Sequence, residues 1–319
     1  MTLLWKKVPG DYTWLNTDGT QRGLSYNAAS NHVLVATRTG FLQIHILDGF
    51  DGSDIGTVDV DPGIVIGGTF PLNMIGVADD GAIFAGNLTL NGTTDPFKLY
   101  RWSSESVTVD PTPAFSGDPG AGVGDRWGDT MDVRGSGVNT EILISSRTGT
   151  NAAIFRTTDG VTFTPTVIHC DVSPSDMGLG AKFGVGNTFW AKCNEGGLTP
   201  GLRHISYDLN TGIGTTLVNY TNFPASAANL GVDNAHNLLA TICIETPNNL
   251  RLYNIANLAA DPAFLDYEFF TPNIAGQATG DIDFGNDRIY ALNSNNGIVA
   301  MTTVPNPKSI KYSYSGNTL

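Results

Sequence analysis

A hairpin pattern recurs along this chain at intervals of about fifty residues. It consists of an apolar strand, a polar turn with Asn, Asp or Gly, and a second apolar strand, as in GLSYNAASNHVLVATR and MIGVADDGAIFAGN. Six copies occur, and the apolar residue before each turn is 49 to 56 residues from the next one. These residues are Tyr26, Val77, Val133, Phe183, Val232 and Phe284. Such a period, with several short strands in each repeat, predicts propeller blades rather than a helical solenoid.

The strands that follow each hairpin predict how the ring closes. Each copy continues with a third strand, and most have a fourth, but the sixth copy ends after GIVAMTTV. The N-terminus carries the spare strand LLWKKV, which can complete the last sheet and leave no open edge. The sequence therefore predicts an all-β fold, a six-bladed β-propeller closed by an N-terminal strand, with seven blades as the alternative. A single domain over 1–319 is expected, with blades at roughly 22–70, 71–124, 125–175, 176–225, 226–275, and 276–304 plus 2–8.

Composition agrees with a turn-rich β protein and limits the class of partner. Glycine occurs 38 times and proline 16 times, and only 15% of the residues are charged. The net charge of −13 repels phosphate backbones and anionic lipids, so neither nucleic acid nor a membrane surface is an expected partner. The first residues, MTLLWKKVPGDYTW, lack the charge and apolar pattern of a signal peptide. The sequence does not indicate an oligomeric state.

One short motif and the repeat as a whole resemble known propellers. The segment RTTDGVTF, residues 156–163, resembles the Asp-box hairpin of sialidase-type propellers, and NTDGTQ at 16–21 is a weaker version. Asp and Gly set the turn of such a hairpin, so the motif supports the fold and not sialidase activity. The six repeats together resemble uncharacterised secreted bacterial six-bladed propellers. This resemblance implies an extracellular or periplasmic location, with the leader absent from this sequence, and no particular reaction.

The first strand of each blade lines the channel of a propeller, and its alternate side chains face the axis. The residues immediately before the six apolar residues that precede the turns are Ser25, Gly76, Asp132, Lys182, Gly231 and Asp283. The residues three positions before the same apolar residues are Gly23, Met74, Thr130, Gly180, Asn229 and Asp281. Charged groups among these small residues predict either a network neutralised by Lys182 or a metal site. The metal ligands would be oxygen donors suited to Ca²⁺, namely Asp132, Asp281, Asp283, Asn229 and Asn73.

The loops that enter the first strands, and the ends of the second strands, predict a polar rim around the channel mouth. Arg38 and Arg147 belong to two RTG turns and can hold a carboxylate, sulfate or phosphate, or form ordinary salt bridges. Arg22 and the segment GDRWGD, with Arg126, Trp127 and Asp129, complete the predicted substrate-binding rim. The tryptophan in that segment is either a sugar platform or a buried packing residue. Glu195 and Glu245 follow second strands and are candidates for general acid–base chemistry.

Two functions from different classes follow. Six-bladed lactonases and phosphotriesterases resemble this architecture and hold Ca²⁺ in the channel, which implies a hydrolase acting on an ester, lactone or phosphoester of a small molecule. Its catalytic residues would be Asp132, Asp283, Lys182, Asp129, Glu195 and Glu245, with Lys182 as the electrophile if it replaces the metal. The alternative is a non-catalytic propeller that binds a glycan or a protein with its rim. Stacking faces would then come from Trp127, Trp102, Trp190 and Tyr207, unless these side chains pack between the blades.

The three cysteines carry two interpretations. Their odd number and the absence of a C-x-x-C motif argue against a disulfide framework and a zinc site. Buried thiols are the simpler interpretation. A bridge between Cys193 and Cys243 is the alternative, because both cysteines lie just past the second strand of neighbouring repeats.

Overall fold

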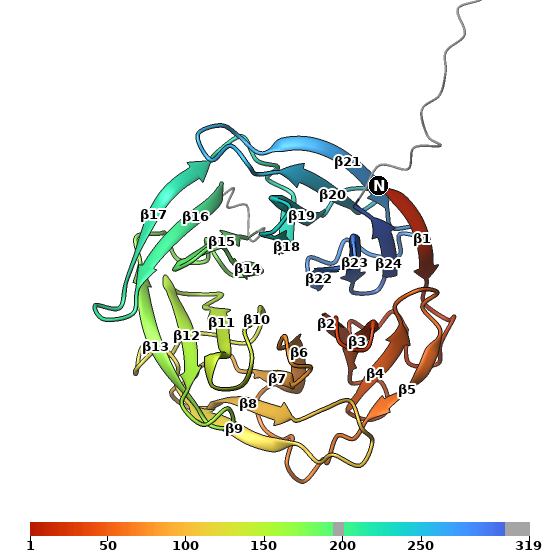
Figure 1. Ribbon diagram of the computed structural model, residues 1–319, viewed down its shortest axis with the longest axis horizontal. Coiled ribbons are helices and arrows are strands. Elements are labelled where there is room, and N and C mark those ends of the chain that lie inside the picture. The colour runs from red at the N-terminus through yellow and green to blue at the C-terminus, as the bar shows by residue number, and fades with distance from the viewer. Residues whose placement is uncertain (194–200, 304–319) are drawn as a thin grey trace, which may run out of the picture.

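The structure is a computed structural model that describes residues 1–193 and 201–303. Its sheets are arranged in a ring around a central axis, in the manner of a β-propeller (Figure 1). In each sheet the strands run from an innermost strand beside the axis to an outermost strand at the rim (Figure 1). This arrangement confirms the prediction of an all-β, propeller-like fold.

Two four-stranded antiparallel sheets form the first part of the chain after the N-terminal strand. One contains β2 (Gln21–Asn27), β3 (His32–Thr37), β4 (Gln43–Asp48) and β5 (Asp54–Val58). The other contains β6 (Phe70–Val77), β7 (Ile83–Leu88), β8 (Phe97–Trp102) and β9 (Thr112–Gly117). In both sheets the strand order is the order along the chain.

The middle of the chain forms one eight-stranded sheet with two antiparallel halves. The first half contains β10 (Asp132–Arg134), β11 (Glu141–Ser145), β12 (Asn151–Thr157) and β13 (Phe163–Cys170), with a short 3-10 helix at Gly137–Asn139. The second half contains β14 (Gly180–Phe183), β15 (Thr188–Lys192), β16 (Leu202–Asp208) and β17 (Ile213–Tyr220). The halves are joined at the rim, where β13 and β17 pair in parallel through His169↔Ile213 and Cys170↔Gly214.

Two further four-stranded sheets complete the ring. One contains β18 (Ala227–Asp233), β19 (Leu238–Cys243), β20 (Asn249–Asn254) and β21 (Ala263–Phe269). The other contains β22 (Gly280–Gly285), β23 (Arg288–Asn293), β24 (Gly297–Thr302) and the N-terminal strand β1 (Thr2–Lys7). The pairs Thr2↔Thr302 and Lys7↔Ile298 place β1 as the outer strand of this last sheet. The predicted closure by an N-terminal strand is therefore confirmed.

The six hairpins of the repeat are present and begin each sheet or half-sheet at the axis. The residues before the turns pair with the start of the second strands, as in Tyr26↔Val33 and Phe284↔Ile289. Several turns contain a left-handed Asn, including Asn31 at φ 59° and Asn237 at φ 55°. Asn tolerates this conformation better than most residues, which explains the Asn-rich turns of the repeat.

Apolar clusters fill the space between neighbouring sheets. Phe84 of β7 meets Phe163 of β13 edge to face, with ring centroids 5.2 Å apart. Phe163 is the aromatic residue of the Asp-box-like hairpin, and Asp159 of the same hairpin accepts backbone hydrogen bonds from Val161 and Thr162. The motif thus has the structural role that its resemblance implies.

The described residues show the state of the three cysteines and contain no helix suited to cross a membrane. Cys170, Cys193 and Cys243 are buried, and no disulfide is present among them, so the alternative of a Cys193–Cys243 bridge is wrong. Among the described residues, no helix has both the length and the apolar character needed to cross a membrane.

Candidate functional site

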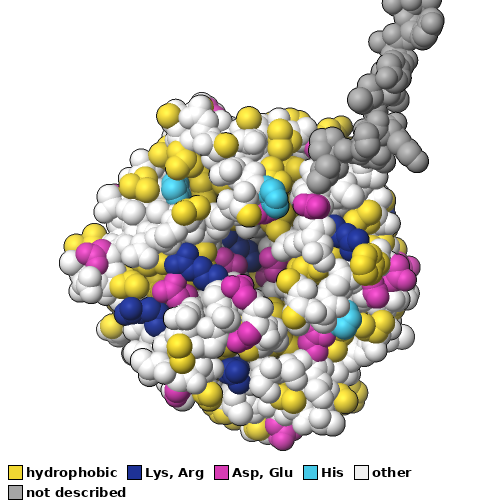
Figure 2. Space-filling model, viewed as in Figure 1, with side chains coloured by type: hydrophobic (Ala, Val, Ile, Leu, Met, Phe, Trp, Pro, Cys, Tyr) yellow, Lys and Arg dark blue, Asp and Glu magenta, His cyan; other side chains and the backbone are white. Residues whose placement is uncertain are grey.

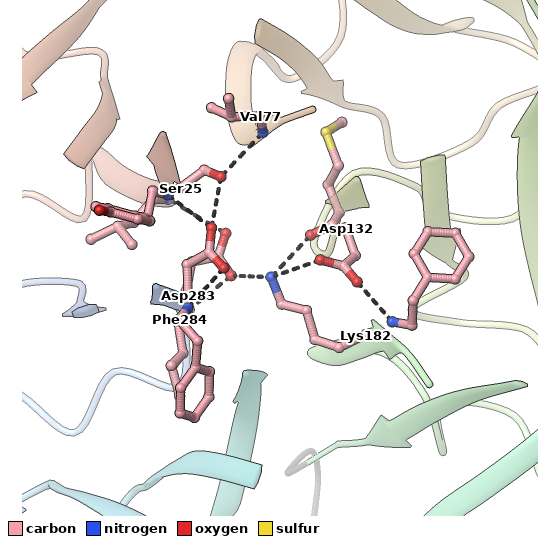
Figure 3. Close-up of polar contacts among 12 residues, drawn as sticks. Ser25, Val77, Asp132, Lys182, Asp283 and Phe284 are labelled. Atoms are coloured by element: carbon pink, nitrogen blue, oxygen red, sulfur yellow. Dashed lines mark hydrogen bonds and ion pairs between the residues drawn. The ribbon is translucent and has the colours of Figure 1, made fainter. Parts of the chain in front are cut away.

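A charged network crosses the channel at the level of the innermost strands. Lys182 extends from β14, and its Nζ lies 3.0 Å from Asp281 Oδ1 of β22 and 3.6 Å from Asp132 Oδ1 of β10. The same ammonium group donates a hydrogen bond to the Met131 carbonyl at 3.3 Å. Figure 2 shows basic and acidic side chains gathered around the central hollow, and Figure 3 shows Lys182 pointing toward Asp132.

The carboxylates of the network are also held by backbone amides and a serine. Asp283 accepts hydrogen bonds from the Ser25 hydroxyl and the Tyr26 amide, both at 2.8 Å. Ser25 Oγ in turn accepts the Val77 amide at 3.1 Å, so the chain of contacts continues from β22 through β2 to β6 (Figure 3). Asp132 accepts the Phe183 amide at 2.7 Å. The predicted axial positions of Ser25, Asp132, Lys182 and Asp283 are therefore brought together.

Burial and charge balance perturb the protonation of this network. Burial raises the pKa of Asp281 to about 7, although the charge of Lys182 opposes this change. Burial also raises the pKa of Asp132, again against the charge of Lys182. For Lys182, burial alone would lower the pKa, but the charges of Asp281, Asp132 and Asp283 outweigh it and raise the pKa. One ammonium thus faces three carboxyl groups, and a proton held by Asp281 near neutral pH reduces the excess of negative charge.

The residues at the axis do not fit the predicted calcium site. The Lys182 ammonium lies between Asp132 and Asp281, where a Ca²⁺ ion would need to sit, and it already provides the positive charge. Asn73 Oδ1 accepts a hydrogen bond from Arg38 at 3.1 Å and so is not turned toward an ion. Asn229 Oδ1 is buried without a hydrogen-bond partner, but its amide group is bonded to the Leu179 carbonyl. Within residues 1–193 and 201–303, no three His, Cys, Asp or Glu side chains are grouped to hold a metal ion.

A second charged cluster lies at the ends where the innermost strands begin. Arg126 binds Asp129 with two hydrogen bonds, from Nε at 2.6 Å and from Nη2 at 2.7 Å. Arg147 Nη1 reaches the same carboxylate at 3.2 Å. The side chain of Asp129 is 1% exposed, whereas those of Arg126 and Arg147 are 22% and 16% exposed. Both oxygens of the Asp129 carboxylate thus accept hydrogen bonds from arginines, so this carboxylate is not placed as a free catalytic base.

Arg22 and Arg38 lie side by side against one aromatic ring. Their guanidinium carbons are 4.9 Å and 4.1 Å from the centroid of Phe70, the first residue of β6. Arg38 is braced by hydrogen bonds to the carbonyls of Leu72 and Gly19, whereas Arg22 donates one bond to the Gly19 carbonyl at 3.3 Å. No carboxylate in the described part of the chain lies within ion-pair distance of either guanidinium.

The pKa values show that these arginines belong to one electrostatic cluster with the GDRWGD segment. Burial lowers the pKa of Arg22; the charge of Asp129 opposes this change, while those of Arg126 and Arg147 add to it. Burial, together with the charge of Arg22, lowers the pKa of Arg38 to about 10. Burial is the main cause of both lowered pKa values, and a bound anion would stabilise the charged form of these partly desolvated guanidinium groups.

Several predicted site residues have other roles. Trp127 is 0% exposed in the core between β6–β9 and β10–β13, so its prediction as a sugar platform is wrong. The stacking predictions for Trp102, Trp190 and Tyr207 are wrong for the same reason, since their exposures are 0%, 2% and 4%. They pack between the sheets, as the alternative interpretation expects.

Of the two glutamates predicted for acid–base chemistry, the structure describes only Glu245. Glu245 follows β19, and both of its carboxylate oxygens accept hydrogen bonds from Arg251 Nη2, at 2.7 Å and 2.6 Å. Glu195 lies outside the described residues. Glu245 is paired with Arg251 and makes no ion pair with Lys182.

Phe70 is the member of the arginine cluster that sequence reasoning did not identify. The register of β6 against β7 shifts between Phe70 and Met74. This irregularity breaks the strict alternation counted back from Val77, so the repeat alone does not place the Phe70 ring beside the arginines.

Sequence comparisons leave this chain without a family. No protein-family model matches the sequence, and no curated protein is similar enough to count as a relative.

Three solved structures resemble the fold at low sequence identity. A DUF4623 family protein from Bacteroides eggerthii DSM 20697 is 17% identical with a TM-score of 0.64, over 89% of this chain and 70% of that one. A protein of unknown function from Bacteroides thetaiotaomicron VPI-5482 is 14% identical with a TM-score of 0.59, over 95% and 75%. Virginiamycin B lyase from Staphylococcus aureus is 13% identical with a TM-score of 0.54, over 95% and 98%. This chain is thus similar in fold to uncharacterised Bacteroides proteins and to a lyase of propeller-like architecture.

Proposed function

We propose that the protein binds an anionic small molecule at the arginine cluster formed by Arg22, Arg38, Arg126 and Arg147. The observation that carries this proposal is the pair Arg22 and Arg38, which are half-buried against Phe70 with no carboxylate partner among residues 1–193 and 201–303. Guanidinium groups present a planar fork of donors that matches carboxylate, sulfate and phosphate oxygens. The bound group would neutralise the charge of Arg22 and Arg38, whereas Arg126 and Arg147 are already paired with Asp129.

The charge of the whole chain makes this local excess of arginine informative. The sequence has 17 Lys and Arg residues against 30 Asp and Glu residues, so acidic partners are abundant elsewhere. Surface arginines in such a protein normally pair with carboxylates. Two neighbouring arginines for which the described residues offer no carboxylate, at the entrance of a channel, are suited to binding an anion.

Calorimetric titration with three probes tests this site and identifies the anionic group. Sodium sulfate, inorganic phosphate and galacturonate represent the three classes of anion. Arg22→Gln is the informative variant, because Arg22 makes one side-chain hydrogen bond to the described residues, at 3.3 Å, and its loss should spare the fold. Arg156→Gln, an exposed arginine on the outer part of β12, is the matched control.

We expect at least one probe to bind, and Arg22→Gln to weaken that binding at least tenfold while Arg156→Gln leaves it unchanged. The probe that binds most tightly identifies the class. If none of the three probes binds, or if both variants bind as the native protein does, the site is not an anion site.

A second candidate function is hydrolysis of an ester, lactone or phosphoester in the channel. It is favoured by Asp281, whose pKa of about 7 is suited to proton transfer at neutral pH beside the Lys182 ammonium. Asp281 would move the proton, and Lys182 would stabilise developing negative charge on the substrate oxygen. Calcium has no part in this proposal, since the donor set does not fit it. The name of the similar virginiamycin B lyase shows that a related fold carries an enzyme.

A screen of esters, lactones and phosphoesters tests the hydrolase. Turnover should fall at least a hundredfold in Asp281→Asn and should depend on a group that titrates near pH 7. Asp110→Asn removes an exposed carboxylate and serves as the control. Absence of turnover, or activity that survives Asp281→Asn, would leave anion binding as the function.

We also propose that β10–β13 and β14–β17 are two separate blades. Each half is antiparallel and starts at the axis, and the parallel contact that joins them involves only two residue pairs at the rim. Counted this way, the ring has six blades.

A further inference from the structure

A groove on the outside of the β18–β21 sheet is separate from the channel and the arginine cluster. Its volume is about 440 Å³, and it is lined by Glu245, Asn249, Arg251, Phe264, Tyr267 and Phe269. Three of these residues are aromatic and belong to the outer strand β21. The other three are polar and come from β20 and the segment that follows β19.

The aromatic side of the groove is open to solvent. Phe264, Tyr267 and Phe269 are 54%, 50% and 37% exposed. The ring centroids of Phe264 and Tyr267 are 6.4 Å apart, and those of Tyr267 and Phe269 are 5.1 Å apart. Phe264 also packs edge to face on the buried Tyr253, with ring centroids 5.7 Å apart, and the exposed parts of the three rings form a continuous apolar surface.

An irregularity in β21 brings these three rings to one face. Phe264 and Tyr267 are three residues apart, so strict alternation along a strand would place them on opposite faces. The register of β20 against β21 shifts so that Leu252 pairs with Asp266 while Tyr253 pairs with Phe264. Leu265 is left unpaired at this point, so the alternation of side chains is reset and Phe264 lies on the same face as Tyr267. The groove is therefore built by a specific feature of the strand.

The polar side of the groove is rigid and electrically balanced. Arg251 donates to both oxygens of Glu245 from Nη2 and to Asn249 Oδ1 from Nε at 2.7 Å. Asn249 Nδ2 donates to Glu245 Oε2 at 3.0 Å, so the three side chains fix one another. The side chains of Arg251 and Glu245 remain 24% and 37% exposed, and the Tyr267 hydroxyl makes no hydrogen bond within the described residues.

We propose that this groove binds a neutral sugar unit of an oligosaccharide. A pyranose ring has an apolar C–H face that packs on aromatic rings and an edge of hydroxyl groups that needs fixed donors and acceptors. The three rings and the Glu245–Arg251–Asn249 set provide both. The guanidinium is already neutralised by Glu245, so the groove selects neither an acidic sugar nor a cation.

Titration with neutral hexasaccharides of β-glucose, xylose, mannose and N-acetylglucosamine tests the groove. We expect at least one to bind, and Tyr267→Ala and Phe264→Ala each to weaken its binding at least tenfold. Phe41→Ala removes an aromatic ring that is 79% exposed elsewhere and should leave binding unchanged. Arg22→Gln should also leave it unchanged, which separates this groove from the anion site.

Two outcomes would overturn the proposal. One is the absence of binding by every hexasaccharide at about 10 mM, a concentration that detects even weak sites. The other is a dimer, seen by sedimentation equilibrium, that Tyr267→Ala dissociates, because a second copy of the chain would then cover the aromatic surface. Circular dichroism of each variant establishes that the fold is intact.

Discussion

Gly128 shows how a residue without a side chain positions the arginine cluster. It lies between Arg126 and Asp129 in the GDRWGD segment, has φ +94°, and a Cβ on it would lie 1.9 Å from the Asn87 carbonyl oxygen. An L-residue there meets both backbone strain and a clash with the main chain of the preceding sheet.

We expect Gly128→Ala to lower the free energy of unfolding by about 3 kcal/mol, measured by chemical denaturation. Gly186→Ala is the matched control, since Gly186 has φ +63° with no atom within 4 Å of a built Cβ. That variant should cost only about 1 kcal/mol, because it adds strain without a clash. If both variants lose the same free energy of unfolding, the close approach of Gly128 to Asn87 does not contribute to the cost.

The raised pKa of Asp281 predicts how the free energy of unfolding changes with pH. Its pKa in the folded state is raised from 3.8 to about 7, so between these values the native protein holds a proton that the unfolded chain has released. This contribution to stability is present at low pH and is lost as the pH rises toward 7 and above.

Relative to the native protein, Asp281→Asn should therefore gain stability as the pH rises from 5 to 8, by about 2 to 3 kcal/mol. Denaturation at several pH values measures the difference, with Asp110→Asn as the exposed control. A difference that stays constant across this range would contradict the raised pKa.

At the scale of elements, the Lys182 network links innermost strands that are far apart along the chain. Lys182 of β14 contacts Asp132 of β10 and Asp281 of β22, and so connects three sheets or half-sheets across the axis. The network is enclosed, so removal of its one ammonium leaves buried carboxylates without a counter-charge.

A double-mutant cycle measures this link. Lys182→Met should lower the free energy of unfolding by about 3 to 5 kcal/mol at neutral pH. Adding Asp281→Asn should restore part of the loss, which gives a coupling of about 1 to 3 kcal/mol between the two positions. Additive losses would mean that Lys182 and Asp281 do not interact in solution.

The same elements show how far a sequence can specify a site. The spacing of the hairpins and the alternation of the first strands are enough to place Lys182, Asp132 and Asp283 at one level of the channel. Alternation fails where a strand is irregular, and both Phe70 and Phe264 lie at register shifts. Burial is equally hard to infer from a motif: Trp127 lies among charged residues in sequence, but its ring packs between two sheets.

At the scale of the whole molecule, the ring brings together residues from distant parts of the chain at one entrance. Arg22 and Arg38 come from the β2–β5 region and Arg126 and Arg147 from the segments around β10 and β11, with Phe70 of β6 between them in sequence. The resulting positive entrance lies in a chain of net charge −13. This contrast between the local and the total charge is the basis of the proposed anion site.

Anomalous diffraction from crystals soaked in sodium selenate tests this claim most directly, because selenium marks the position of a bound tetrahedral anion. We predict an anomalous peak in contact with the guanidinium groups of Arg22 and Arg38, and its loss in crystals of Arg22→Gln. Selenium peaks elsewhere, with none beside these two arginines, would contradict the account.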